Sequence, residues 1–420
     1  MLDNNYNLKI RNNVVLALGL VSAAIYALCS HTLIYWLSDL DIPTKALGFV
    51  SLIYIIQALK IFWIPVFEKF NVPLLNKFLD RRASWIFLCI LVSGSLILYI
   101  SFLHPLRNMY VFATCIAIAT FGMSIMDTLL RAQIMKLAID NDKDQTTIMG
   151  LGAFGFRIGM YICINIYFLL SLCIAWKYIY RVSGVLIILS SLLLFILPKV
   201  TELSKEKSLK ELLIVPYQSF LKKNKKYIWS IVGFMVFFRL QDKLLAPTFY
   251  KFISGLKPAS SLPFISQLGI KPIFSFYKFI SGPIMAFSVY YSIKFLKKHS
   301  YKSNAFISVL VHSLTCLPLL ILNMQKTHIP LFILFTLLLE KLVRGFSSNV
   351  YYLYQSKFCE KEHAAGQIAM LSFLEAMSGA IFGLSSGYIV AYFSWTALFI
   401  LGTFISLPVL FFIKKLPNDL

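Results

Sequence analysis

The sequence predicts an all-α polytopic membrane protein. Of its 420 residues, 59% are hydrophobic and only 14% are charged, whereas a soluble domain carries about 25% charged residues. The mean hydropathy is +0.76. Apolar runs of about 20 residues, the length of a helix that crosses a bilayer, recur along the whole chain. An outer-membrane barrel would instead show short alternating segments, so the pattern favours a bundle of transmembrane helices.

Taken in order, the apolar runs give twelve expected spans. Their approximate limits are 14–37, 46–67, 84–103, 109–138, 148–173, 178–198, 227–253, 270–296, 304–324, 329–358, 366–392 and 394–414. The first run is too long for a signal-peptide core and has no clear cleavage site, so we expect it to be retained as a span. The run at 270–296 contains Lys271, Lys278 and Pro283, and a re-entrant segment is the alternative there.

The positive charge of the chain sets its expected orientation. The formal net charge is +22, and Lys and Arg gather in the segments that face the cytoplasm if the N-terminus lies inside. This positive-inside distribution predicts that both termini are cytoplasmic. Nucleic-acid binding would need a basic face on a soluble domain, and the sequence shows no such domain.

A lysine-rich hydrophilic segment splits the spans into two sets of six. We therefore expect an N-terminal six-helix bundle at 1–198, a cytoplasmic linker at 199–226 and a C-terminal six-helix bundle at 227–420. The middle of the linker, 209–220, is mildly amphipathic and suited to lie along an inner leaflet of anionic lipid. A plain solvated linker is the alternative.

Acidic and basic residues at helical spacing stand in or at the ends of the apolar runs, one such pair in each half. Asp127 precedes Arg131 by four residues, and Glu340 precedes Arg344 by four, so each pair shares one helical face. A charge in hydrocarbon costs at least about 2.5–3.5 kcal/mol. These residues should therefore face a bundle interior or a water-filled cavity.

Acids within the spans are candidates for proton coupling. They are Asp127, Asp242, Glu340 and Glu375. A carboxyl group that alternates between an apolar setting and a neighbouring cation takes up a proton in one and releases it in the other. Asp242 has Arg239 three residues before it, whereas Glu375 has no cation at helical spacing. A purely structural ion pair is the alternative for each paired acid.

Basic and aromatic residues of the spans are candidates for binding a solute. They are Arg131, Arg157, Arg239, Arg344, Lys60 and Trp36. A planar guanidinium suits a carboxylate bidentately, and Arg157 stands in a glycine-rich run without an acid at helical spacing. A bond to a helix end or to an acid of another helix is the alternative for Arg157. Trp36 is a candidate to stack on a sugar face.

The layout of six plus six spans around a basic cytoplasmic segment resembles the major facilitator superfamily, whose halves flank a substrate site near the midplane. The stretch Asn76-Lys-Phe-Leu-Asp-Arg-Arg82 resembles the short D-R-x-x-R-R loop of that superfamily, without its usual glycines. The fold class that this implies is a major facilitator fold, with twelve transmembrane helices as two six-helix bundles.

A narrower resemblance, to the AmpG-type muropeptide permeases, rests on motifs that occur in order along nearly the whole chain. In the first half they begin at Leu28 (similar to L-x-S-x-T-L-x-x-W-L), Leu47 (I-G-F-x-S-L), Lys60 (K-F-L-W-S-P) and Gly155 (G-Y-R-x-G-M). In the second half they begin at Arg239 (K-x-G-D), Glu340 (E-N-x-x-x-G) and Gln367 (Q-F-A-L-L-S), with Ser394-Trp395 similar to a G-W before the last span.

The chain departs from this family in its fourth span. The family carries D-x-x-x-D-A-W there, with a further acid a few residues on. Asp127 matches the first acid, but Arg131 replaces the second, Gln133 replaces the tryptophan and Lys136 stands at the further acid. Exchanging an acid for a base in a buried site should change what that site accepts.

The resemblance implies a secondary active transporter of the bacterial inner membrane. Its solute would be a muropeptide, an anhydro-sugar peptide from cell-wall turnover, or a related anion, imported with protons by alternating access. Its partners would be this small-molecule solute, protons and the lipid bilayer, and we expect a monomer. The reversed charges at Arg131 and Lys136 leave a second interpretation open, a non-transporting membrane sensor or interaction protein that kept the transporter fold.

Neither an enzyme nor a metal or cofactor site is expected. The seven cysteines form no CxxC pair, and the six histidines show no paired-ligand spacing. The sequence also lacks a G-x-x-x-x-G-K-[ST] stretch for nucleotide phosphates. The energy for transport would therefore come from an ion gradient.

Overall fold

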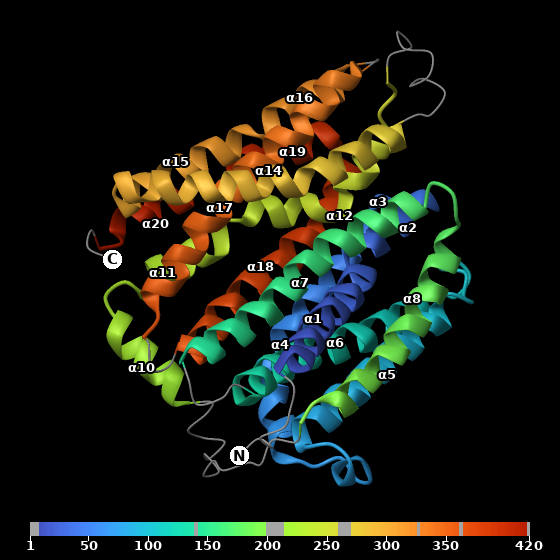
Figure 1. Cartoon of the computed structure of the whole chain (residues 1–420). Helices are drawn as coiled ribbons and strands as arrows, with labels where there is room; N and C mark the ends of the chain where they lie inside the picture. Colours follow the sequence, from blue (N-terminus) through green and yellow to red (C-terminus); the bar gives the residue numbers. More distant parts are fainter. Residues whose placement is uncertain are drawn as a thin grey trace. The chain divides into compact units, whose positions relative to one another are not determined.

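A computed structural model describes residues 8–137, 142–198, 214–258, 270–325, 328–360 and 364–417. In these ranges the regular structure is helical, apart from one isolated β-bridge between Pro258 and His328 (Figure 1). Each of the twelve ranges expected to span the membrane contains helix. The chain has the all-helical architecture that its apolar runs predicted.

The first half of the chain contains α-helices and short 3₁₀ helices. They are α1 (Leu8–Cys29), α2 (His31–Asp39), α3 (Thr44–Phe49), η1 (Val50–Leu52), α4 (Ile53–Lys69), η2 (Leu75–Lys77), α5 (Arg81–Ile100), α6 (Met109–Leu137), α7 (Asp142–Leu170), α8 (Trp176–Ser190) and η3 (Ser191–Ile196). Those of the second half are α10 (Val215–Asn224), α11 (Ile228–Phe237), α12 (Leu240–Ser254), α14 (Ile270–Lys298), α15 (Tyr301–Leu314), α16 (Cys316–Met324), α17 (Pro330–Phe358), α18 (Ala364–Tyr392), α19 (Trp395–Ile405) and α20 (Val409–Lys415).

Eight helical stretches of the described residues are long and apolar enough to cross a membrane, judged by length and composition. Helix α17 is equally long but falls outside this set, because Glu340, Lys341 and Arg344 interrupt its apolar stretch. The segment made by α11 and α12 is broken at Arg239. The chain is a multi-pass membrane protein, and the number of twelve spans stays a prediction.

The first expected span begins earlier in the structure than the sequence predicted, and the expected span at 270–296 is a single helix. Helix α1 begins at Leu8 rather than near 14, because the polar residues before the apolar run take part in packing. Arg11 is fully buried and its Nη1 donates to the carbonyl of Leu137, 2.9 Å away, at the end of α6. At 270–296 the structure has one continuous helix, α14, which passes through Pro283, so the re-entrant alternative is not supported.

By its internal contacts the chain divides into two units. The first comprises Met1–Asp39 with Leu59–Glu206, and the second comprises Leu40–Ala58 with Lys207–Leu420. Residues 40–58 thus pack with the second unit, although their place in the sequence put them in the first bundle. The division into bundles at 1–198 and 227–420, with a linker at 199–226, stays a prediction.

In the first unit, α1 lies against α7, and α5 lies against α6 and α8. Glycines set the close approach of α1 and α7. A Cβ on Gly155 would lie 2.5 Å from the carbonyl oxygen of Leu16, and one on Gly19 would lie 2.7 Å from that of Gly152. The glycine-rich run around Arg157 therefore serves helix packing, as small residues commonly do between membrane helices.

In the second unit, α14 lies against α17 and α12 against α18. The described part of the linker docks on this unit. Phe220 of α10 is fully buried in an aromatic core with Phe234 and Tyr354, and Asn224 donates to the carbonyl of Phe358 at 3.3 Å. Helix α10 is therefore packed against protein, while residues 209–213 lie outside the described ranges.

Residues 40–58 join the second unit through a seam of small residues between α3, η1 and α18. Ser51 Oγ donates to the carbonyl of Ala380 at 3.1 Å, and Gly48 faces the carbonyl of Leu384 so closely that a Cβ would lie 2.5 Å from it. Small residues in such a seam let two helix backbones meet.

An ion pair lies at one end of this seam. Lys251 Nζ lies 2.5 Å from Asp41 Oδ1, and its hydrogen bond and charge lower the pKa of Asp41. The pair is thus intact at neutral pH and is lost only as the pH falls below the usual range of an aspartate. Because Asp41 is exposed, such a pair stabilises little, and backbone packing holds the seam.

We predict that Gly387→Ala opens the seam. A Cβ at this position would lie 2.1 Å from the carbonyl oxygen of Thr44, and backbone atoms there have no freedom to move aside. Overpacking of this kind typically costs about 1–3 kcal/mol. The variant should melt at a lower temperature in detergent. Gly255→Ala is the matched control, because its nearest atoms lie 3.5 Å away; equal melting temperatures for both variants would contradict the seam.

Candidate functional site

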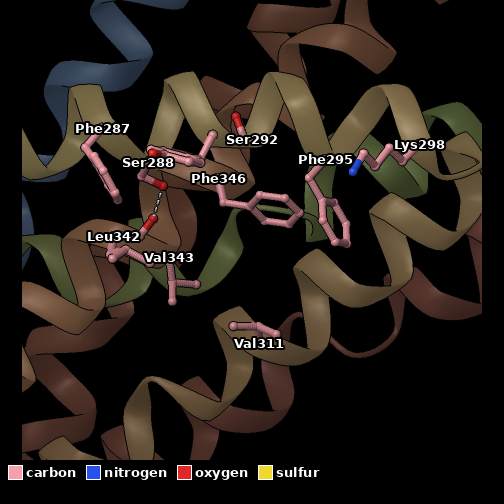
Figure 2. Close-up of a pocket in the computed structure, with 10 residues that line it drawn as sticks. Phe287, Ser288, Ser292, Phe295, Lys298, Val311, Leu342, Val343 and Phe346 are labelled. Carbon is pink, nitrogen blue, oxygen red and sulfur yellow. Dashed lines mark hydrogen bonds between the residues drawn. The ribbon is translucent and has the colours of Figure 1, made fainter.

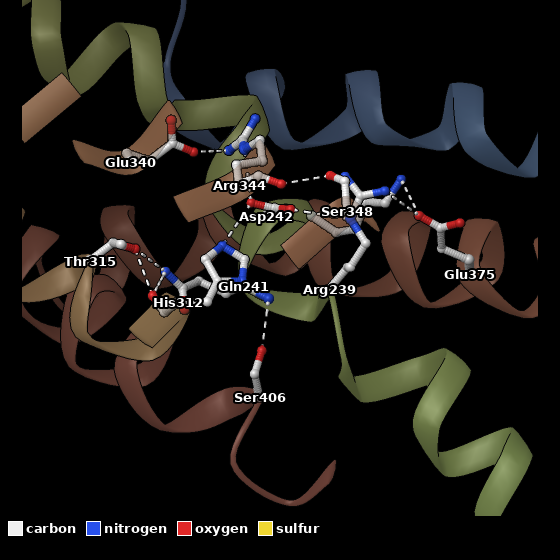
Figure 3. Close-up of polar contacts among 11 residues, drawn as sticks. Arg239, Gln241, Asp242, His312, Thr315, Glu340, Arg344, Ser348, Glu375 and Ser406 are labelled. Carbon is white, nitrogen blue, oxygen red and sulfur yellow. Dashed lines mark hydrogen bonds and ion pairs between the residues drawn. The ribbon is translucent and has the colours of Figure 1, made fainter. Parts of the chain in front are cut away.

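Seven charged or titratable side chains gather inside the second unit (Figure 3). This buried charge cluster consists of Arg239, Asp242, Lys243, His312, Glu340, Arg344 and Glu375. They come from the start of α12 and from α15, α17 and α18, so residues far apart in the sequence meet at one place.

Asp242 lies at the centre of the cluster. Its Oδ1 is 3.0 Å from Arg344 Nε and 3.1 Å from His312 Nε2, and its Oδ2 is 3.4 Å from Arg239 Nε. The side chain of Asp242 is only 7% exposed. Burial on this scale is tolerated because cations and a hydrogen-bonding imidazole surround the carboxylate.

The remaining acids extend the cluster in two directions. Glu340 pairs with Arg344 one helical turn away. On the other side, Glu375 Oε1 lies 3.5 Å from Arg239 Nη1 and 3.4 Å from Lys243 Nζ. Arg344 and Arg239 are therefore both shared between two carboxylates, so a change in one pair must affect the next.

Three interrupted spans meet beside this cluster. Helix α11 gives way to α12 at Phe238 and Arg239, α15 gives way to α16 at Thr315, and α19 gives way to α20 around Ser406. Gln241 connects the three breaks. Its backbone N–H donates to Ser406 Oγ at 3.3 Å, and its Nε2 donates to Thr315 Oγ1 at 2.9 Å and to the carbonyl of His312 at 3.1 Å. These bonds satisfy polar groups that a membrane interior would otherwise leave unpaired.

The charges of the cluster balance when His312 is neutral. Three cations face three carboxylates, and Asp242 also lies in the first turn of α12, where the helix dipole favours an acid. Lys278 and Lys341 lie within electrostatic range of Glu340 and Arg344. The seven side chains are therefore close to neutral as a set, with these two lysines beside them.

The first unit holds a small cavity with an ion pair in its wall. Arg131 Nε lies 3.2 Å from Asp127 Oδ2, as their spacing predicted, and the two residues line a cavity of about 100 Å³ together with Ser22 and Phe156. The side chain of Arg131 is 62% exposed and that of Asp127 is 18% exposed. This ion pair is open, whereas the pairs of the buried charge cluster are enclosed.

Among the other sequence candidates, Arg157 and Trp36 belong to neither group. Arg157 is an exposed residue of α7, and its side chain forms no hydrogen bond or ion pair within the described ranges. Lys60 lies in α4, with a side chain outside the described part of the structure. Trp36 is 5% exposed and packs against Tyr180 and Phe112, with ring centroids 4.6 Å and 5.5 Å away. A packing role fits Trp36 in this conformation.

Three members of the site were not singled out from the sequence. His312 stands in an apolar run, where any titratable side chain is unusual, and this signal could have identified it. Lys243 directly follows Asp242. Gln241 precedes Asp242, and neither its bonds nor the helix breaks leave a local sequence signal.

No protein-family model matches the chain. Curated relatives match it over nearly its full length. The protein named "Putative transporter AmpG 2" from Rickettsia bellii is 29% identical over 99% of this chain and 98% of its own length, and "Putative transporter AmpG 1" from Rickettsia felis is 26% identical over all of both chains. The chain is thus similar over nearly its whole length to proteins that are named AmpG transporters. The resemblance seen in its motifs is confirmed.

Solved structures identify the fold. The nucleoside transporter NupG matches 96% of this chain and 98% of its own with a TM-score of 0.70 at 17% identity. A D-xylose-proton symporter matches 98% of this chain and 98% of its own with a TM-score of 0.66 at 14% identity. The chain has the major facilitator fold, and its fold and relatives are those of a membrane transporter.

We predict that Asp242→Asn destabilises the protein far more than Asp127→Asn. The first change leaves Arg344 and Arg239 without their shared carboxylate inside the protein, which typically costs about 3–5 kcal/mol. Asp127→Asn leaves Arg131 without its partner, but this side chain is already exposed, so the loss of folding free energy should be about 1 kcal/mol or less. Thermal unfolding of the two purified variants in one detergent measures the difference. Equal decreases in melting temperature would show that the enclosed pairing of Asp242 adds nothing to the stability of the protein.

Proposed function

We propose that the chain is a secondary active transporter of the bacterial inner membrane that imports muropeptides, or a related anionic solute, together with protons. The observation that supports this best is the buried charge cluster, in which two arginines are each shared between two carboxylates. Such sharing allows a solute anion to replace one carboxylate at an arginine. A proton can then neutralise the carboxylate that has been displaced. In the proposed arrangement both termini are cytoplasmic and the monomer is the working unit.

Arg344 would connect proton binding to solute binding. It pairs with both Glu340 and Asp242. When a carboxylate of the solute attracts Arg344, Glu340 loses its cation in a setting of low dielectric constant, where protonation becomes favourable. One proton would then bind Glu340 each time Arg344 moves to the solute. Release of that proton on the other side of the membrane would restore the Glu340–Arg344 ion pair. Asp242, Glu375 and Asp127 are the further candidates for proton coupling.

Four arginines are the candidate ligands of the solute, two of them exposed and two within the buried charge cluster. Arg131 and Arg157 present exposed guanidinium groups in the first unit, and a muropeptide carries several carboxylates that a guanidinium binds bidentately. Arg239 lies within the buried charge cluster and would act with Arg344. Lys60 stays a candidate from its place in the sequence alone.

Uptake into membrane vesicles tests the coupling. We predict that Glu340→Gln abolishes accumulation driven by a proton gradient but keeps exchange between labelled and unlabelled solute, because exchange needs no release of the proton. A labelled anhydro-sugar peptide is the first solute, with other anionic metabolites screened beside it at two pH values. Accumulation that persists after the gradient is collapsed would contradict proton coupling. Solute binding without any uptake would instead favour the sensor interpretation.

The role of an open arginine is tested by Arg157→Gln. Loss of a charge-assisted hydrogen bond costs about 1.5–3 kcal/mol, so we predict a KM for the solute raised ten-fold or more, with a maximal rate that changes little. Lys177→Gln is the matched control, because Lys177 is an exposed cation of the same unit at the start of α8. An equal change of KM in both variants would remove Arg157 from the site.

A further inference from the structure

An open groove lies on the second unit, bounded by α14, α15 and α17 (Figure 2). Its volume is about 490 Å³, which lies in the range of sites for small molecules. No residue of the buried charge cluster lines it. The groove is therefore separate from the candidate transport site.

The walls of the groove are apolar and open. Phe287 and Tyr291 of α14 are 56% and 51% exposed, and Leu342 of α17 and Val311 of α15 are 42% and 41% exposed. Because these helices belong to a membrane protein, such side chains suit contact with a hydrocarbon chain rather than with water.

The polar atoms of the floor are already bonded. Ser288 Oγ donates to the carbonyl of Leu342 at 2.5 Å, and Ser292 Oγ donates to that of Val289 at 2.7 Å. Asn349 Nδ2 also donates to Ser292 Oγ at 2.5 Å. The floor has few hydrogen bonds left to offer, so it favours an apolar occupant over a sugar or a peptide.

One end of the groove is cationic. Among the described side chains that line the groove, Lys298 is the one that is charged, and it lies beside Phe295 at the end of α14. In the sequence Lys294, Lys297 and Lys302 stand within four residues of Lys298. No Asp or Glu occurs between Asp242 and Glu340, so α14 and α15 bring no acid to oppose these cations. An occupant of this end should carry negative charge.

We propose that the groove binds an anionic phospholipid of the cytoplasmic leaflet, with one acyl chain between α14 and α17 and the phosphate at Lys298. The expected orientation of the chain places this end of α14 at the cytoplasmic surface, where anionic lipid meets basic residues. A zwitterionic lipid would bring its own cationic group toward Lys298, so its binding should be weaker. An apolar slot that ends in a cation selects for a molecule that is both apolar and anionic.

The occupied groove adjoins the turn of α17 that precedes Arg344. Leu342 and Val343 line the groove, and Gly345 lies so close to α14 that a Cβ there would be 2.8 Å from Ser288 Cβ. A bound chain would hold α14 and α17 together at this level. Anionic lipid should therefore stabilise the folded protein as well as remain bound to it.

The test uses the purified full-length protein after removal of lipid. We expect phosphatidylglycerol to be retained in native mass spectrometry and to raise the melting temperature more than phosphatidylcholine with the same acyl chains. Lys298→Gln should weaken retention of phosphatidylglycerol about five-fold, the effect of one basic residue near an anionic surface. Leu342→Trp should lower retention of both lipids by filling the slot, and its exposed position gives the larger side chain room.

Lys177→Gln is the control and should retain lipid as the unaltered protein does. Equal retention of phosphatidylglycerol and phosphatidylcholine would overturn the proposal, as would full retention by Lys298→Gln. Glycerol phosphate alone should give no stabilisation. If it stabilises as well as the lipid does, the site binds free phosphate and the apolar slot has no part in it.

Discussion

Three side chains converge on the carboxylate of Asp242, from Arg344, His312 and Arg239. Taking this carboxylate out of water costs several kcal/mol, which only well-placed cations and donors repay. The requirement fixes more than one residue. It brings α15 and α17 to the start of α12. The breaks in α11–α12, α15–α16 and α19–α20 lie where Gln241 forms hydrogen bonds with polar groups at the other two breaks. The pairing of the buried charges and the interruption of the helices therefore depend on each other.

The two ion pairs with matched spacing occupy different environments. Arg131 pairs with Asp127 alone, and 62% of its side chain is exposed. Arg344 is 26% exposed and is shared between Glu340 and Asp242. In the first unit the arginine replaces an acid of the AmpG-type motif, and it stands at a cavity. In the second unit the acid of the motif is retained. In the first unit the departure from the family motif therefore lies at an open cavity.

Features set by local spacing were predictable from the sequence, and features set by long-range contact were not. The apolar runs located the helices, and spacing by four residues predicted both ion pairs, since one helical turn brings such residues together. His312 lies 70 residues from Asp242, and Glu375 lies 136 residues from Arg239, so no periodicity could join them. The break at Phe238 and Arg239 contains neither Gly nor Pro, the residues that usually announce one.

Balance of charge gives the buried cluster its proposed behaviour. Arg239, Lys243 and Arg344 match Asp242, Glu340 and Glu375 in number, and none of these side chains is more than 26% exposed. A solute carboxylate that enters would leave one negative charge too many among them. Protonating one of the three acids restores the balance at once. Because both events compensate each other at a shared arginine, anion entry and proton uptake would occur together rather than separately. This compensation of charge is the physical reason for proposing a proton symport of an anion.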